Sequence, residues 1–411
     1  MQSTAELNDL AMILAAAFLG GALLRQLRQP VLIGYILVGT IFGPAGLGLV
    51  ENADDIQWLA ELGILLLMFY IGLEMDLSQF RAVARPAVVT TLIQIAVGVG
   101  VMYGVGFITG WPFKTAFLLG CCIAVSSTAV ALKVLEEMDA KRTHGGAVSM
   151  GILIAQDISV VPMMLILGAM RMGGTVNLMG LVKLIAGLLI LAAVMWLLSE
   201  QPQWFMHWGR KFARVKAKAM KGQTTITALA VCFTGAALAG ALGFSAAYGA
   251  FLAGLMLSRT RSREKVQKNT RPVFDLLIMV FFLSVGLLID LHFIIAHWLT
   301  VAGLVIGALM LKTLLNVAVL RLQKVPAPDA WLAGAVTGQL GEFSFLLAGM
   351  GIADGSLDDG AHKYVLAVIS LSLVCTPLWL ALLHRLRLIP KVTITPGEAL
   401  ESAARGVVKA R

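Results

Sequence analysis

Apolar runs of 18–23 residues recur along the whole chain, and each is long enough to cross the hydrocarbon core of a membrane as a helix. Of the 411 residues, 59% are hydrophobic and 13% are charged. A water-soluble protein of this size has too small an interior to bury so much apolar surface. The sequence therefore predicts an all-α polytopic membrane protein.

We predict thirteen transmembrane helices in one integral domain over residues 1–390, followed by a short cytoplasmic tail over 391–411. The expected spans are 8–25, 30–48, 57–75, 86–109, 114–135, 147–169, 178–198, 224–242, 244–258, 273–290, 298–320, 328–352 and 362–384. The first span follows Glu6 and Asp9 and lacks a basic segment before it. It is therefore expected to be a membrane helix rather than a cleaved signal peptide.

Lysines and arginines are distributed unequally over the two sides of this predicted topology. With the N-terminus outside, the cytoplasmic segments hold 27 of the 32, and the outer segments hold four, namely Lys114, Arg171, Lys183 and Lys363. Basic loops remain on the cytoplasmic side, so we expect the N-terminus outside and the C-terminus in the cytoplasm. This asymmetry, together with contact to anionic membrane lipids, accounts for the net charge of +9, and no nucleic-acid partner is expected.

Two short sequence matches indicate an inverted repeat. The segment "IGLEMDL" at 71–77 recurs as "VGLLIDL" at 285–291, and "LVG" at 37–39 recurs as "LAG" at 252–254, at offsets of 214 and 215 residues. The first pair closes predicted helices three and ten, which are seven helices apart, so the second copy is expected to be inverted in the membrane. Inverted repeats are the common architecture of secondary transporters, with the substrate site near the midplane between broken helices.

Two predicted spans carry residues that loosen a membrane helix, at positions related by the repeat. Helix five has Ser126, Ser127 and Thr128 at its centre, and helix twelve has Gly338 and Gly341 about 214 residues later. Glycine and hydroxyl clusters allow a helix to break, because side chains and neighbours can satisfy the freed backbone groups. Close packing of small residues against neighbouring helices is the alternative. We predict that both helices are broken.

Asp157 lies about ten residues into predicted helix six, where its carboxylate cannot bend to the membrane surface. An acid at this depth marks an ion or proton site, or else a polar contact that fixes helix packing. Burial favours the neutral acid and a nearby ammonium favours the charged one, so a proton and a cation can compete for it. Hard oxygen ligands suit a monovalent cation. The predicted ion and proton site therefore consists of Asp157, Gln156, Ser126, Ser127 and Thr128.

Lys312 is the expected charge partner of Asp157. It lies nine residues before Arg321, which places it about 13 Å from the cytoplasmic end of its helix, beyond the reach of a lysine stem. Asn316 follows one turn later on the same helix face. Glu342, in the broken part of helix twelve, either lines the ion pathway or caps a half-helix. Asp275, near a helix end, is a candidate for guiding cations toward the site.

Together these segments resemble the monovalent cation:proton antiporter-2 family, in its Kef-type potassium/proton branch and close to the MagA-like offshoot of that branch. The resemblance covers about residues 10–390, through "PVLIGYILVGTIFGPAGLGLV", "AVSSTAVALKVL", "GILIAQDISVVPMM", "MVFFLSVGLLID" and "GQLGEFSF". It implies the sodium/proton antiporter fold, in a homodimeric elevator of the bacterial inner membrane whose core moves around crossed helices five and twelve. It also implies Asp157 as the ion and proton carrier and matches Lys312 to the lysine of the eleventh helix.

The sequence departs from the Kef-type pattern in two places. Kef-type proteins end in a nucleotide-binding domain with a glycine-rich fingerprint, and no G-x-G-x-x-G motif occurs here. The basic stretch "SRTRSREKVQKNTRP" stands where the Kef-type loop carries an acidic gating motif, so glutathione control is not expected. A separate regulatory subunit is not specified by the sequence.

The sequence therefore predicts a secondary active transporter that exchanges a monovalent cation, K⁺ in preference to Na⁺, for H⁺ by alternating access. One alternative is transport of a divalent metal or iron, as the MagA-like resemblance suggests, although no histidine or cysteine ligand is expected at the midplane. A cation channel is another, although it does not explain the buried carrier acid. No nucleophile–base constellation and no cofactor loop is found in the sequence, so no enzyme activity, cofactor or resident metal is expected.

Overall fold

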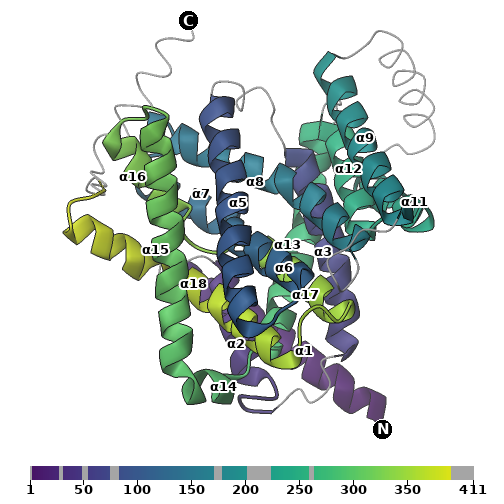
Figure 1. Ribbon diagram of the computed structural model, residues 1–411. Coiled ribbons are helices and arrows are strands. Elements are labelled where there is room, and N and C mark those ends of the chain that lie inside the picture. Colours follow the sequence, from purple (N-terminus) through teal and green to yellow (C-terminus); the bar gives the residue numbers. More distant parts are fainter. Residues whose placement is uncertain are drawn as a thin grey trace, which may run out of the picture.

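The computed structural model is built of helices (Figure 1) and describes residues 2–26, 31–48, 54–74, 83–170, 178–200, 224–258 and 263–389. The predicted tail at 391–411 lies outside the described residues. The described helices are α1 (Gln2–Gln26), α2 (Val31–Phe42), α3 (Asp54–Glu74), α5 (Ala84–Thr109), α6 (Phe113–Ala124), α7 (Thr128–Glu137), α8 (His144–Ala169), α9 (Leu178–Glu200), α11 (Thr224–Ala241), α12 (Ala246–Ser258), α13 (Arg263–Leu287), α14 (Leu291–Ala296), α15 (Trp298–Leu322), α16 (Ala327–Val336), α17 (Glu342–Ala353) and α18 (Asp359–Arg385).

The helices follow the predicted spans closely. Each predicted span coincides with one helix, or with two consecutive helices in the case of spans five and twelve. Within the described part of the chain, seven helical segments are long and apolar enough to cross a membrane: α5, α6 together with α7, α8, α11, α13, α15 and α18. The chain is thus an all-helical membrane protein, and the total of thirteen spans remains a prediction.

The largest differences from the prediction are at three helix boundaries and one short helix. α1 begins at Gln2 rather than at residue 8. α2 ends at Phe42 rather than at residue 48, because Gly43 and Pro44 follow and a residue before proline avoids the helical conformation. α13 begins at Arg263 rather than at 273, because the glutamate, lysine, glutamine and arginine residues of this extension favour helix. The short helix α14 was not predicted.

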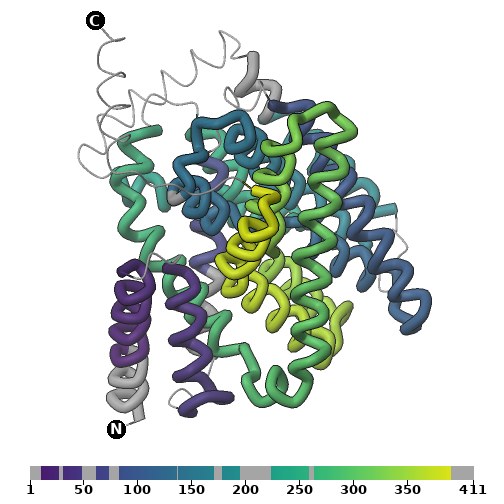
Figure 2. The backbone as a smooth tube through the Cα atoms, turned by 90° about the vertical axis from the view of Figure 1, so that its left-hand side faces the viewer, coloured from purple at the N-terminus to yellow at the C-terminus, as the bar shows by residue number. Residues whose placement is uncertain are grey.

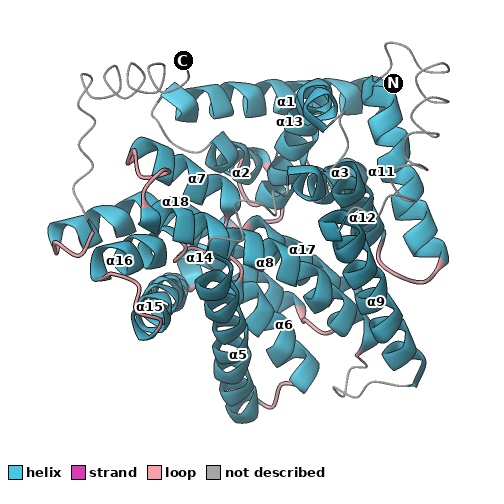
Figure 3. Ribbon diagram, turned by 90° about the horizontal axis from the view of Figure 1, so that it is seen from above, coloured by secondary structure: helices cyan, strands magenta, loops and turns pink. Residues whose placement is uncertain are grey.

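The helices form two groups (Figures 1 and 3). In the flanking group, α3 packs against α12 and α13, and α2 packs against α1 and α13. In the crossing group, α5 packs against α6 and α8, α17 packs against α6, and α15 packs against α16 and α18. α9 contacts α8 of one group and α12 of the other. Figure 2 shows the N-terminal helices, in purple, toward one edge of the molecule, and α15–α18, in green to yellow, beside the blue α5.

The repeated sequence motifs contact each other across the flanking group. Gly39, in the first "LVG" copy on α2, lies against Gly286 on α13, and a Cβ on Gly39 would collide with the backbone there. Gly254, in the matching copy on α12, lies in the same way against the backbone of α3 near Gly72. Each short motif of one copy therefore packs on the long motif of the other, and these glycines permit the close approach of the backbones.

Helix starts in the crossing group recur at the offset of the sequence repeat. α5 and α15 begin at Ala84 and Trp298, and α6 and α16 begin at Phe113 and Ala327. α7 and α17 begin at Thr128 and Glu342, so all three pairs of starts are 214 residues apart. This agreement supports the proposed inverted repeat.

Two ion pairs and one histidine–aspartate contact tie helix ends together. They are Lys114–Asp354 at 2.8 Å, His144–Asp329 at 3.0 Å and Lys363–Asp290 at 3.1 Å. Each pair joins segments that the predicted topology assigns to the same face of the membrane, so these contacts are compatible with that topology.

Asp290 caps the N-terminus of α14, and this cap should make the stability of the folded state sensitive to acid. Its Oδ1 accepts from the backbone amide of Phe293 at 2.9 Å and its Oδ2 from Nζ of Lys363 at 3.1 Å. The Phe293 bond, and then Lys363, holds the pKa of Asp290 below its ordinary value against partial burial. A lowered folded-state pKa stabilises the protein above the unfolded-state pKa, and this contribution is lost as the pH falls through the folded-state value.

For Asp290→Ala we expect the free energy of unfolding to fall by about 1 kcal/mol at neutral pH, which is the usual contribution of an N-cap residue. The difference in melting temperature from wild type, measured in detergent, should shrink as the pH is lowered. Asp290→Asn, which keeps a capping oxygen, should lose less. A deficit of Asp290→Ala that stays constant down to acidic pH would contradict this account.

Candidate functional site

Spans five and twelve are both interrupted, as the sequence predicts, and the two interruptions touch. Extended residues 125–127 separate α6 from α7, and residues 337–341 separate α16 from α17. The backbone amide of Gly341 donates to Val125 O at 3.1 Å, and the Ser126 hydroxyl donates to Thr337 O at 2.7 Å. A Cβ on Gly341 would lie 2.5 Å from the backbone of Ser126, so only glycine permits this approach. We call this contact region the crossing.

Lys312, on α15, binds both interruptions at once. Its ammonium donates to Val125 O at 2.7 Å, to Ser126 Oγ at 2.9 Å and to Gln339 O at 2.8 Å, and the residue is 2% exposed. The two carbonyls follow the C-terminal ends of α6 and α16, where the helix dipoles are negative. A lysine has three donors, and all three are used here. The predicted partnership with Asp157 is therefore not a direct hydrogen-bonded ion pair in this structure.

Asp157 lies in the middle of α8 and is 8% exposed. Its carboxylate oxygens accept from Thr128 Oγ1 at 3.3 and 3.4 Å. Thr128 is the first residue of α7, so the acid faces the positive N-terminal end of a half-helix. Its oxygens thus point into the protein at the crossing, as an ion site in this helix requires.

Gln156 caps the broken backbone. Its Oε1 accepts from the amide of Ser126 at 3.0 Å, and its Nε2 donates to Ala124 O at 3.1 Å. Leu340 lies 214 residues after Ser126 and is its counterpart in the second half of the chain. The backbone amide of Leu340 donates to the Ser372 hydroxyl at 3.1 Å. The side-chain amide of Gln156, predicted as an ion ligand, is thus engaged with the backbone at the end of α6.

Gln94, on α5, was not identified from the sequence as a site residue. It accepts from Nε2 of Gln156 at 2.8 Å through its Oε1 and donates from its Nε2 to Asn316 Oδ1. Nδ2 of Asn316 donates in turn to Thr337 Oγ1 at 2.8 Å. These four side chains form an amide ladder from α8 through α5 and α15 to the second interruption. The signal for Gln94 was available, because it is an isolated polar residue within an apolar span.

The remaining candidates occupy different positions. Glu342 is the first residue of α17, and its carboxyl group faces the Ser127 side chain and the backbone amides of Thr128 and Glu342, which resembles the predicted capping role. Asp275 is exposed on α13, 3.9 Å from Arg271, and not at the crossing. Among the residues that the structure describes, no three histidine, cysteine, aspartate or glutamate side chains gather as a metal site.

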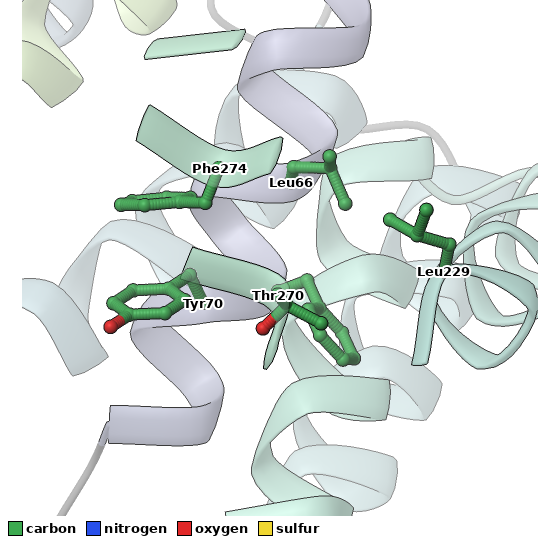
Figure 4. A pocket seen from close by; sticks show the side chains of 6 residues that line it. Leu66, Tyr70, Leu229, Thr270 and Phe274 are labelled. Atoms are coloured by element: carbon green, nitrogen blue, oxygen red, sulfur yellow. The ribbon is translucent and has the colours of Figure 1, made fainter. Parts of the chain in front are cut away.

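A small pocket in the flanking group is lined almost entirely by apolar atoms (Figure 4). Tyr70 of α3 stacks on Phe274 of α13 with ring centroids 4.0 Å apart. Thr270 supplies a hydroxyl to the lining, but that hydroxyl donates to Val266 O at 2.8 Å within its own helix. The pocket is a packing gap between α3, α11 and α13, and the crossing remains the candidate site.

The chain is similar to proteins of known family and fold. Residues 13–385 match the family model described as "Sodium/hydrogen exchanger, transmembrane". The chain is 40% identical to the iron transporter MagA of Paramagnetospirillum magneticum, over 95% of this chain and 88% of that protein. It is 29% identical to K(+) efflux antiporter 5 of Arabidopsis thaliana, over 97% of this chain and 71% of that protein.

The sodium proton antiporter MjNhaP1 of Methanocaldococcus jannaschii has the same fold. Its structure superposes with a TM-score of 0.66, covering 93% of this chain and 98% of that chain at 16% identity. The fold that the sequence resemblance implies is therefore the fold of this structure.

For Gln94→Leu we expect the free energy of unfolding to fall by about 1–3 kcal/mol, because the amide groups of Gln156 and Asn316 each lose a buried partner. Thermal unfolding in detergent measures this loss. Gln323→Leu is a matched control, because Gln323 bonds Thr90 Oγ1 and Val319 O near the end of α15 and is only partly buried. Equal melting temperatures for the two variants would rule out a stabilising amide ladder.

For Lys312→Gln we expect the free energy of unfolding to fall by at least about 2 kcal/mol, because two amide hydrogens cannot replace three charge-assisted hydrogen bonds. The variant should also shift the pH profile of transport. The exposed pair of Lys141 with Glu136 supplies a control, since Lys141→Gln should change stability by less than about 0.5 kcal/mol. An unchanged melting temperature and pH profile for Lys312→Gln would remove Lys312 from the mechanism.

Proposed function

The chain belongs to the sodium/hydrogen exchanger family of transmembrane proteins, and from this membership we propose that it exchanges a monovalent cation for H⁺, with Asp157 holding each in turn. The observation that carries the proposal is the position of this acid, buried at the centre of α8 and facing Thr128 at the crossing. A buried charge is costly unless something binds it. An acid retained there is explained by a cation or a proton that neutralises it.

The chemistry of exchange follows from competition for one carboxylate. The anion of Asp157, the Thr128 hydroxyl and nearby backbone carbonyls offer the hard oxygen ligands that a dehydrated monovalent cation needs. A bound proton removes the charge and so releases the cation. The loaded site is close to neutral, whereas the empty site exposes an uncompensated charge to the membrane interior. Translocation is therefore favourable only when the site carries a cation or a proton, which couples the two fluxes.

We propose K⁺ as the preferred cation, with Na⁺ also accepted. The similarity to K(+) efflux antiporter 5 supports this preference. The residue before Asp157 is the neutral Gln156, and its amide is engaged with the backbone of Ser126 and Ala124. One acid per site then suits one proton for one monovalent cation, and hence electroneutral exchange.

We propose an elevator movement in which the crossing group travels relative to the flanking group. The helices pack mainly within these two groups, which supports rigid-body motion of one against the other. We further propose a homodimer in the bacterial inner membrane, with the N-terminus outside and the C-terminus in the cytoplasm. The excess of lysine and arginine in the segments assigned to the cytoplasm supports this orientation.

Iron transport is the second candidate, favoured by the 40% identity to the iron transporter MagA. The ligands around Asp157 weigh against it, because the atoms that the structure places there are oxygens and no cluster of three metal-binding side chains occurs in the described ranges. Divalent transition metals prefer sites with imidazole or thiolate ligands. A cation channel is another alternative. A channel would conduct the cation alone, whereas a carrier saturates and exchanges the cation for a proton.

Asp157→Asn should abolish exchange while the protein stays folded. In proteoliposomes with an imposed pH gradient, adding K⁺ should dissipate the gradient with wild type, Na⁺ should do so more weakly, and Fe²⁺ should not. The Asp157→Asn variant should fail with all three ions. Asp359→Asn, at an exposed site at the start of α18, serves as the control and should exchange like wild type. K⁺-driven proton flux of normal size through Asp157→Asn would overturn the proposal.

A further inference from the structure

Glu342 is a buried acid of the crossing that exchange through Asp157 does not use. It is 6% exposed. The Ser127 side chain and the backbone amides of Thr128 and Glu342 are the donors that face its carboxyl group. Its Oε2 atom, in contrast, has no hydrogen-bond partner among the residues that the structure describes. The donors that face this carboxyl group therefore leave Oε2 unpaired.

Gln339, three residues before Glu342, also carries a buried oxygen without a hydrogen-bond partner in the described part of the chain. The residue is fully buried, and its Nε2 donates to Ser127 O at 3.3 Å. This bond fixes the orientation of the amide, because the backbone carbonyl can only accept. Its Oε1 has no partner within the described residues. Gln339 and Glu342 thus both contact Ser127, and each leaves one buried acceptor without a donor.

A negative charge on Glu342 would also lack a cationic partner. Lys312, on α15, uses its three donors on Val125 O, Ser126 Oγ and Gln339 O. None of the ion pairs found in the described part of the chain includes Glu342. A buried carboxylate in this situation is costly.

Two other titratable groups lie close to Glu342, and neither supplies a positive charge. Asp157, on α8, contacts Thr128 as Glu342 does, and its anion would repel a second anion. Cys122, on α6, is occupied with Ser344 O at 3.6 Å.

We propose that Glu342 is a second proton-binding site, which at neutral pH keeps a proton on Oε2 and donates it to Oε1 of Gln339. The proton then turns Oε2 from an unpaired acceptor into a donor, gives Oε1 of Gln339 its partner, and removes the uncompensated charge. The other oxygen of the neutral acid still accepts from the starts of α7 and α17. This inference rests on the proposed function only in its consequence, which is that Glu342 retains its proton while Asp157 remains the acid that exchanges.

Infrared spectroscopy can detect this proton without any transport measurement. Among the described residues, Asp157 and Glu342 are the buried acids, so the Asp157→Asn variant isolates Glu342. At neutral pH this variant should show the carbonyl band of a protonated carboxylic acid, and the double variant Asp157→Asn/Glu342→Gln should lack it. Absence of the band from Asp157→Asn, or its persistence in the double variant, would overturn the proposal. Failure of the exchange proposal would leave this result unaffected.

Two further variants test the partner and the charge state. Gln339→Leu in the Asp157→Asn background should shift the carboxylic-acid band, because the O–H group loses its acceptor, and an unshifted band would exclude Gln339 as that acceptor. Glu342→Gln imitates the neutral acid, since its amide both accepts and donates. Its melting temperature should differ from that of wild type by less than about 2 °C from acidic to alkaline pH. A deficit that grows as the pH rises would show that Glu342 is charged in the wild type and would overturn the proposal.

Discussion

The structure depends on the pairing of backbone groups that two broken helices expose inside a membrane. Lipid offers no donors or acceptors, so each freed amide and carbonyl must be satisfied by the protein itself. At the crossing this is done by Lys312, which binds carbonyls of both interruptions, by Gln156, which binds Ser126 N, and by the direct bond from Gly341 to Val125. The first role of these polar residues in the core is therefore to hydrogen-bond the backbone groups that the helix breaks leave unpaired.

The same solution prepares the proposed ion site. Breaking spans five and twelve places the N-terminal ends of α7 and α17 and the C-terminal ends of α6 and α16 together within the protein. The positive helix ends face acids, Asp157 through Thr128 and Glu342 directly, and the negative ends face Lys312. Because these partial charges are fixed by the backbone, binding a cation or a proton at Asp157 requires little reorganisation. The proposed difference between the two acids, one exchanging and one retaining its proton, arises from their surroundings.

Packing of the flanking group explains why the short sequence repeats are visible at all. Gly39 and Gly254 stand where two helix backbones approach too closely for any side chain, and each faces the longer motif of the other copy. The same steric requirement, a glycine at a close contact between two helix backbones, applies in both halves of the chain. Side chains at the ion site face no such shared requirement, so Gln156 in one half is matched in function by Ser372 in the other.

The sequence by itself determined the helical membrane class, the breaks at Ser126–Thr128 and Gly338–Gly341, and the depth of Asp157, because hydropathy, helix-loosening residues and position along a span are local properties. It also supported the family through the segments that carry the resemblance. Tertiary structure alone decided which polar atoms pair: that Lys312 binds carbonyls, that Gln156 caps a backbone break, and that Gln94 joins Gln156 to Asn316. Periodicity places a side chain on a helix face but does not say which helix lies opposite, and a hydrogen bond requires both partners within about 3 Å.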